Sequence, residues 1–188
     1  MTQSTSFPAG VGGPPSGGPR KGGTGRLAGF VLAAAAATVG LMAGTFFAFA
    51  VSVMPALATV DDEKFVEVMN KINVSIENNQ AFLLTFTGAF VFSGAAAIMH
   101  HRMGARAAAR WIIAGLALYV VALAVTMGFN IPLNQQLAKA GLPGGTADLA
   151  AARADFEGPW DAYNVVRTIA CTLALVCLGR AVSLRRAR

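Results

Sequence analysis

Residues 27–54, LAGFVLAAAAATVGLMAGTFFAFAVSVM, contain neither a charged residue nor a proline. A helix of roughly 20 apolar residues crosses a bilayer core about 30 Å thick, so this run is long enough to span a membrane. Three further apolar runs follow it. We therefore predict an all-α fold, an integral membrane four-helix bundle with spans at about 27–54, 81–99, 111–130 and 161–182.

The composition agrees with a membrane protein, because 55% of the 188 residues are hydrophobic and only 13% are charged. The formal net charge is +6. Basic residues accumulate on the cytoplasmic loops of membrane proteins, so this charge does not indicate nucleic acid, and we expect no nucleic-acid partner. Cys171 and Cys177 lie in one apolar helix and point in different directions, so we expect two packing residues and no disulfide.

The chain outside the spans divides into tails and connecting segments. Residues 1–26 are rich in Gly, Pro and Ser, so we expect a disordered cytoplasmic tail. The four-helix domain should extend over 27–182, and 183–188 should form a basic cytoplasmic tail. Between spans 1 and 2, and between spans 3 and 4, periodic patterns predict amphipathic helical segments at the outer surface.

Two prolines are expected to interrupt helices, because proline lacks the N–H that a helix interior needs. Pro55 should end or kink the first helix, and Pro132 should bend the third. An Ala-rich helical pattern ends near Phe156, and Gly158-Pro159 then predicts the start of the fourth helix.

Charges are distributed unequally between the two ends of the predicted bundle. One end carries basic residues and no acidic residue: Arg20, Lys21, Arg26, Arg102, Arg106, Arg110, Arg180, Arg185, Arg186 and Arg188. All nine acidic residues belong to the other end. Basic loops stay inside, so we predict a multi-pass protein of the plasma membrane with both termini cytoplasmic.

The fourth span contains a permanently charged side chain. Trp160, Asn164 and Arg167 are spaced at i, i+4 and i+7, which places them on one helix face. An arginine at the centre of a span costs about 2.5–3.5 kcal/mol on insertion scales, so Arg167 is a candidate functional residue. The alternative is that Arg167 reaches outward to water, lipid phosphate, Asp161 or Glu157.

A second polar stripe follows the third span. Tyr119, Thr126, Asn130 and Asn134 are spaced at whole helical turns and share one face. A bundle would bring this stripe, the Trp160 face and Asn73 of the outer segment to a similar depth, which predicts a polar pocket in the outer half. The alternative for each asparagine is a hydrogen bond between helices.

Several other kinds of site lack the residues they need. The only histidines, His100 and His101, are adjacent in a predicted solvated basic loop, so ligands for haem, zinc or a di-metal centre are missing. The spans contain no carboxylate of the kind that proton-driven transporters use. We expect no metal and no cofactor.

Several blocks of the sequence resemble the anthrone-oxygenase-like family of small four-helix membrane proteins, long catalogued as a domain of unknown function. The resemblance covers about residues 30–180. The blocks are GTFFAF at 44–49, VMPAL at 53–57, MNKIN at 69–73, TMGFNIPLN at 126–134 and WDAYNVVR at 160–167.

The resemblance implies an activity, because characterised members oxidise anthrones to anthraquinones with O2. That chemistry needs no metal or flavin: the anthrone loses a proton, its enolate reduces O2, and the hydroperoxide collapses to quinone and water. The nearest candidates for a base are Asp161 and Glu77. The expected catalytic residues, which would stabilise the oxyanion, are Arg167, Asn164, Asn130 and Asn134. The expected substrate-binding residues are Trp160, Asn73, Tyr119 and Thr126.

The same pocket also fits a non-catalytic membrane protein that holds a lipid, a quinone or another subunit, so the sequence leaves enzymatic activity open. The expected partners are the lipid bilayer and a planar aromatic small molecule. Small residues at every fourth position of the first span favour close helix packing, and a homo-oligomer would use the face that contains Gly40 and Gly44.

Overall fold

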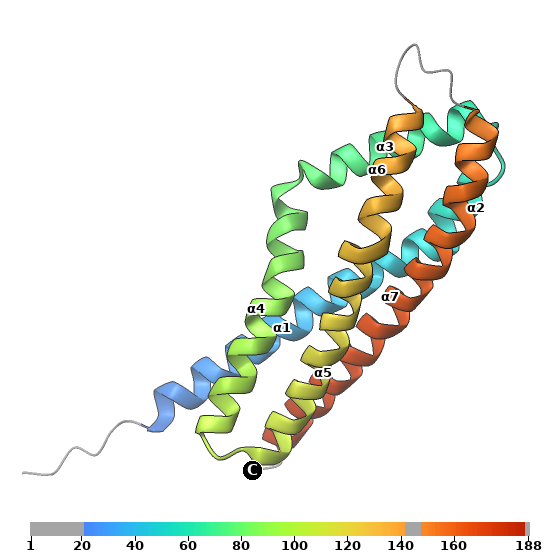
Figure 1. Ribbon diagram of the computed structural model, residues 1–188. Coiled ribbons are helices and arrows are strands. Elements are labelled where there is room, and N and C mark those ends of the chain that lie inside the picture. The colour runs from blue at the N-terminus through green and yellow to red at the C-terminus, as the bar shows by residue number, and fades with distance from the viewer. Residues whose placement is uncertain (1–20, 142–147, 187–188) are drawn as a thin grey trace, which may run out of the picture.

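The computed structural model describes residues 21–141 and 148–186, and every regular element in this part of the chain is a helix. Four continuous helical stretches are long and apolar enough to cross a membrane (Figure 1). They are Gly23–Leu57, Gln80–Arg102, Arg106–Ala140 and Leu149–Arg185. The predicted all-α class and the four apolar helices are confirmed, and they are the features of a multi-pass membrane protein.

The bundle consists of α1 (Lys21–Ala48), α4 (Gln80–Arg102), α5 (Arg106–Val125) and α7 (Leu149–Arg186). Helices α1 and α5 each pack against both α4 and α7, which closes a ring of four helices. Alanine and medium-sized apolar side chains fill its interior. Large apolar side chains point outward, including Phe30 at 72% exposure and Leu84 at 73%. Such an apolar outer surface is typical of a protein that lies in a membrane.

The predicted N-terminal tail differs from the structure at its end. Residues 1–20 lie outside the described residues, but Lys21 already begins α1, so the segment 21–26 is helical. At the other end of the chain, α7 continues to Arg186, and residues 187 and 188 lie outside the described part.

Two long helices pass through a π-helical turn that ends two residues before a proline. Helix α1 continues through η1 (Phe49–Val53) into α2 (Met54–Leu57), and α5 continues through η2 (Thr126–Asn130) into α6 (Ile131–Ala140). The amide that follows each π turn bonds five residues back, to the carbonyl of Phe49 or Thr126. The first helix therefore does not end at Pro55, and the disturbance expected at Pro55 and Pro132 takes the form of a π turn.

Helix α3 (Asp62–Glu77) lies across one end of the bundle, which we call the capped end (Figure 1). The Asp61 side chain caps the helix by accepting a hydrogen bond from the Lys64 amide at 2.8 Å. Its apolar face, with Phe65, Val66 and Met69, packs against α6 and α7. The buried members of this second hydrophobic cluster are Met54, Leu57, Phe65, Val66, Met69, Leu137, Phe156 and Trp160.

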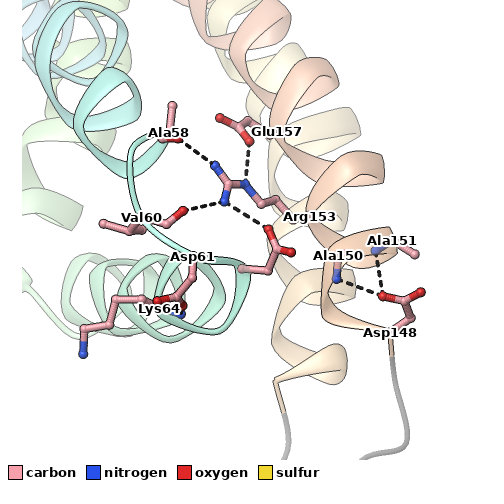
Figure 2. A network of polar contacts seen from close by, with 10 residues as sticks. Ala58, Val60, Asp61, Lys64, Asp148, Ala150, Ala151, Arg153 and Glu157 are labelled. Atoms are coloured by element: carbon pink, nitrogen blue, oxygen red, sulfur yellow. Dashed lines mark hydrogen bonds and ion pairs between the residues drawn. The ribbon is translucent and has the colours of Figure 1, made fainter.

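Helix α7 is a single helix that contains Pro159, so the prediction that a new helix starts at Gly158-Pro159 was wrong. Tertiary contacts fix the turns before this proline. Arg153 of α7 donates to the carbonyl of Val60 at 2.8 Å and to Glu157 at 2.8 Å (Figure 2). It also donates to Asp62 at 3.1 Å. Phe156 and Trp160 are buried on either side of the proline. These contacts outweigh the cost of one missing helical hydrogen bond.

Candidate functional site

A cavity of about 170 Å³ lies inside the capped end. Its walls come from both hydrophobic clusters: Phe46 belongs to the cluster inside the bundle, and Trp160 belongs to the second cluster, at the capped end. All four long helices and α3 contribute to it. The lining residues are Thr45, Phe46, Phe49, Asn73, Ile76, Glu77, Phe82, Leu83, Phe86, Thr126, Asn130, Ile131, Asn134, Trp160 and Arg167.

Arg167 is a buried cation in this cavity, with 5% of its surface exposed. Its guanidinium carbon lies 4.3 Å from the centre of the Phe46 ring and 5.2 Å from that of Trp160. In the described part of the chain no carboxylate lies within ion-pair distance of it. In the structure, Arg167 therefore does not reach outward to water, Asp161 or Glu157.

A buried charge without a counter-charge is costly, and cation–π contacts offset only part of that cost. The guanidinium has one hydrogen-bonding side chain, Asn164, among the described residues. Its Nε is buried and has no hydrogen-bond partner within the described ranges. The cavity therefore presents an electropositive floor, which favours a ligand that carries or develops negative charge.

Asn164 lies behind the guanidinium and does not line the cavity. It is fully buried, accepts a hydrogen bond from Nη2 of Arg167 at 3.0 Å and donates one to the carbonyl of Phe46 at 3.0 Å. It links α7 to α1 and holds Arg167 in place. Its contacts are those of a positioning residue.

Trp160 forms one wall and is held by two asparagines. Its indole Nε1 donates to Oδ1 of Asn134 at 2.8 Å, and its carbonyl accepts from Nδ2 of Asn130 at 3.4 Å. Its ring packs on Phe49, with centroids 5.5 Å apart, and on Phe156 at 6.0 Å. The asparagines therefore form the interhelical hydrogen bonds considered as their alternative role, and both also line the cavity.

Three unpartnered polar atoms belong to residues that line the cavity. Oδ1 of Asn130, Nδ2 of Asn73 and Nε of Arg167 are buried and have no hydrogen-bond partner among the described residues, and all three residues line the cavity. Buried polar groups in proteins are almost always hydrogen-bonded. This set of two donors and one acceptor fits a ligand with oxygen atoms.

The two remaining predicted residues are placed differently. Thr126 lines the cavity and donates its hydroxyl to the carbonyl of Ala122 at 2.8 Å. Tyr119 is fully buried outside the lining and donates to the carbonyl of Phe86 at 2.8 Å. It precedes Thr126 by two turns, about 10 Å along the helix, and the cavity does not extend that far. The cavity thus brings together Arg167, Asn130, Asn134, Trp160, Asn73 and Thr126, and leaves Asn164 and Tyr119 behind its walls.

Sequence reasoning missed most of the aromatic wall. Phe46, Phe49, Phe82 and Phe86 line the cavity, and Phe82 stacks on Phe86 with centroids 6.0 Å apart. Phenylalanines in an apolar span look the same whether they face lipid or a cavity. A signal for two of them existed, because Phe46 and Phe49 belong to the block at 44–49.

At the opposite end of the bundle, the structure contradicts the prediction that the two histidines lie in a solvated loop. His100 is not in a solvated loop: it lies within α4, is fully buried, and places Nδ1 2.8 Å from the carbonyl oxygen of Ala96. Helix α4 continues to Arg102, past the expected end of the span. Among the residues that the structure describes, no group of three His, Cys, Asp or Glu side chains lies close enough to hold a metal ion.

Comparison with known proteins gives one match. The family model described as anthrone oxygenase matches residues 75–177. No curated protein and no solved structure matches the chain. The matched segment contains every lining residue of the cavity except Asn73 and the three from the first helix, Thr45, Phe46 and Phe49.

Proposed function

Because this chain belongs to the anthrone oxygenase family, we propose that it is a membrane oxygenase that uses O2 to oxidise an anthrone or a similar planar phenolic substrate in the cavity at the capped end. The observation that carries this proposal is the buried Arg167, which has no carboxylate partner among the described residues and lies against two aromatic rings. Its position suits a substrate that is flat and becomes negatively charged as it reacts.

The charge arises when the substrate loses a proton. An anthrone has a CH2 group between two aromatic rings and a carbonyl opposite to it. Removing one proton from the CH2 leaves an enolate whose negative charge rests mainly on the carbonyl oxygen. A guanidinium already fixed beside that oxygen stabilises this state without having to reorganise. Arg167 is fixed in this way by Asn164.

Oxidation then proceeds at the former CH2 carbon. The enolate passes its electrons to O2, a C–O bond forms, and the hydroperoxide loses water to leave a second carbonyl. The sum is one CH2 group and one O2 giving one C=O group and one water. The electrons come from the substrate, so we propose that no metal or flavin takes part and that O2 is the co-substrate.

Each predicted residue has a role in this proposal. Arg167 stabilises the oxyanion, and Asn130 accepts a hydrogen bond from a phenolic hydroxyl through its free Oδ1. Trp160 packs against the substrate rings, and Asn134 fixes Trp160. Asn73 and Thr126 contribute polar contacts at the wall. Asn164 and Tyr119 do not contact the substrate. Asn164 positions Arg167, and Tyr119 positions Phe86.

The charges support an orientation. Acidic side chains gather at the capped end, on α3 and at the start of α7, whereas Arg102, Arg106 and Arg180 lie toward the opposite end. We propose that the protein lies in the plasma membrane with both termini in the cytoplasm and the capped end outside. Substrate would then enter from the outer half of the bilayer or from outside.

The helix face with Gly40 and Gly44, proposed for a homo-oligomer, is partly covered by α7 of the same chain. A Cβ at Gly40 would lie 3.7 Å from Leu175 of α7, whereas none of the described atoms lies within 4 Å of one at Gly44. Only the Gly44 half of that face is therefore available to a second copy of the chain.

A turnover assay tests the function. Purified protein in detergent or lipid is mixed with anthrone under air, and quinone absorbance and O2 uptake are followed together. We expect both to exceed the spontaneous rate and to stay in a one-to-one ratio. A protein that binds anthrone but leaves the spontaneous rate unchanged would instead be a membrane binding protein. An absorption spectrum with a strong haem or flavin band would contradict the proposal of a cofactor-independent reaction.

A further inference from the structure

The cavity lining contains one side chain of each charge, Arg167 and Glu77. Arg167 forms part of the floor and is almost fully buried. Glu77 also lines the cavity, but it is the last residue of α3 and its side chain is exposed. Apolar and aromatic walls, including Phe82 and Phe86, lie in the same cavity. A ligand in this space is therefore enclosed by a lining that contains both a cation and a carboxylate.

Neither charge forms an ion pair with another described residue. In the described chain no Lys, Arg or His lies within ion-pair distance of Glu77. Glu67 on the same helix is different, because it is bound by Lys64 at 2.8 Å and also by Lys71. Glu77 and Arg167 do not pair with each other either, so a ligand can contact both without first breaking a salt bridge.

The stability of α3 does not account for Glu77. The carbonyl end of a helix carries partial negative charge, so a carboxylate at the last position is unfavourable there. An acidic residue at this position fits a function in the cavity better than a function in the helix.

We propose that Glu77 is the general base that removes the proton from the substrate, an inference that rests on the oxygenase function proposed above. No other acidic side chain in the described part of the chain lines the cavity. Asp161, the other candidate, is adjacent to Trp160 in sequence but lies outside the lining, and its Oδ1 is buried without a partner.

The proton and electron movements balance with Glu77 acting at one carbon. A carboxylate oxygen of Glu77 takes one proton from the CH2, and the electron pair of that bond becomes the enolate whose oxygen faces Arg167. After O2 adds, Glu77 returns this proton to the peroxide. It then removes the second proton from the same carbon, the C=O bond forms, and the O–O bond breaks. The released hydroxide takes the proton from Glu77 as water.

Proton abstraction can be measured without oxygen. In D2O under strictly anaerobic conditions, exchange of the anthrone CH2 hydrogens for deuterium reports the base alone, and quinone formation under air reports the whole reaction. We expect wild type to accelerate both above background. Glu77→Gln should lower both by about 100-fold or more, the usual size of a general-base contribution. Quenching of tryptophan fluorescence should show that this variant still binds anthrone.

A matched control and a rescue separate catalysis from folding. Glu63→Gln removes the same charge from the first turn of α3, away from the cavity, and should leave both rates unchanged. Glu77→Ala should regain exchange when acetate is added, because a small carboxylate can occupy the space left by the side chain. A merely structural role would not produce this rescue.

The outcomes distinguish the two proposals. If Glu77→Gln exchanges deuterium at the wild-type rate, Glu77 is not the base, even if quinone formation confirms the oxygenase. If wild type catalyses Glu77-dependent exchange but forms no quinone, the base is supported and the oxygenase function fails. If wild type accelerates neither process, both proposals are overturned.

Discussion

Arg167 donates a hydrogen bond from Nη2 to Oδ1 of Asn164, three residues earlier on the same helix, at 3.0 Å. The amide nitrogen of Asn164 is committed in turn to the carbonyl of Phe46 on α1, and the Phe46 ring lies under the guanidinium. Asn164 therefore fixes the guanidinium of Arg167, because its own side-chain amide is anchored to the backbone of α1. This arrangement holds the charge at a fixed place and leaves its Nε free.

Arg167→Met tests the charge with little change in volume. We expect quinone formation to fall by about 10²- to 10³-fold, the usual effect of removing an oxyanion-stabilising group. We also expect an unchanged or higher thermal unfolding temperature, because the variant removes a buried charge that has no counter-charge among the described residues. The measurements are the initial rate under air and Tm in the same detergent. A large fall in Tm would show that Arg167 is needed for folding.

The Trp160–Asn134 hydrogen bond fixes the aromatic wall, and a double-mutant cycle measures it. Trp160→Phe leaves Oδ1 of Asn134 without its donor, and we expect a loss of about 1–3 kcal/mol in the free energy of unfolding. Asn134→Ala removes the acceptor, and the double variant should lose less than the sum of the two single variants. Strictly additive losses would mean that this bond contributes nothing.

The apolar runs were sufficient to predict the four helices, because a span such as 27–54 is specified by length and hydropathy alone. The continuity of α7 through Pro159 was not predictable in this way. It depends on Arg153 reaching Ala58, Val60 and Asp62, residues about ninety positions away. Similarly, a proline in a sequence does not reveal that a π turn will precede it, as happens at Pro55 and Pro132.

The candidate site was partly predictable, because polar residues are rare in spans and so stand out. Asn130, Asn134, Trp160 and Arg167 were identified in this way, and they line one cavity. The sequence did not show how far along the helices the cavity extends. Tyr119 shares the helical stripe, yet it is buried in the core at Phe86. The phenylalanines of the wall were missed because sequence does not distinguish Phe82, in the cavity, from Leu84, which is exposed on the outside.

Arg153 connects α7 to the start of α3, and its loss should weaken the packing of α3 on the capped end (Figure 2). Arg153→Met removes bonds to two backbone carbonyls and two carboxylates, and we expect unfolding to become easier by about 2 kcal/mol. Because α3 carries Asn73 and Glu77, the KM for anthrone should rise as well. Hydrogen–deuterium exchange should increase in α3 and stay unchanged in α5. Equal exchange in both helices of variant and wild type would contradict this role.

Gly115 lies at a close contact between α5 and α7. A Cβ at this position would lie 3.1 Å from the carbonyl oxygen of Ala174 and 3.4 Å from Leu178. Gly115→Val should therefore separate the helices and destabilise the protein by about 1–3 kcal/mol, seen as a lower Tm. Gly94→Ala in α4 is the control, since none of the described atoms lies within 4 Å of a Cβ there, and it should leave Tm unchanged or raise it slightly. Similar losses in both variants would show that helix crowding is not the cause.

The proposed orientation predicts which residues a reagent outside the cell can reach. Thr59 lies at the capped end, in the turn before α3, and is exposed. Met103 lies at the opposite end, in the turn between α4 and α5, and is also exposed. In intact cells a membrane-impermeant maleimide should label Thr59→Cys and should not label Met103→Cys. After the cells are opened both should react, which shows that each thiol is accessible, and Cys171 and Cys177 should stay unlabelled because both are buried. Labelling of Met103→Cys alone in intact cells would place the capped end in the cytoplasm, and substrate would then have to reach the cavity from inside.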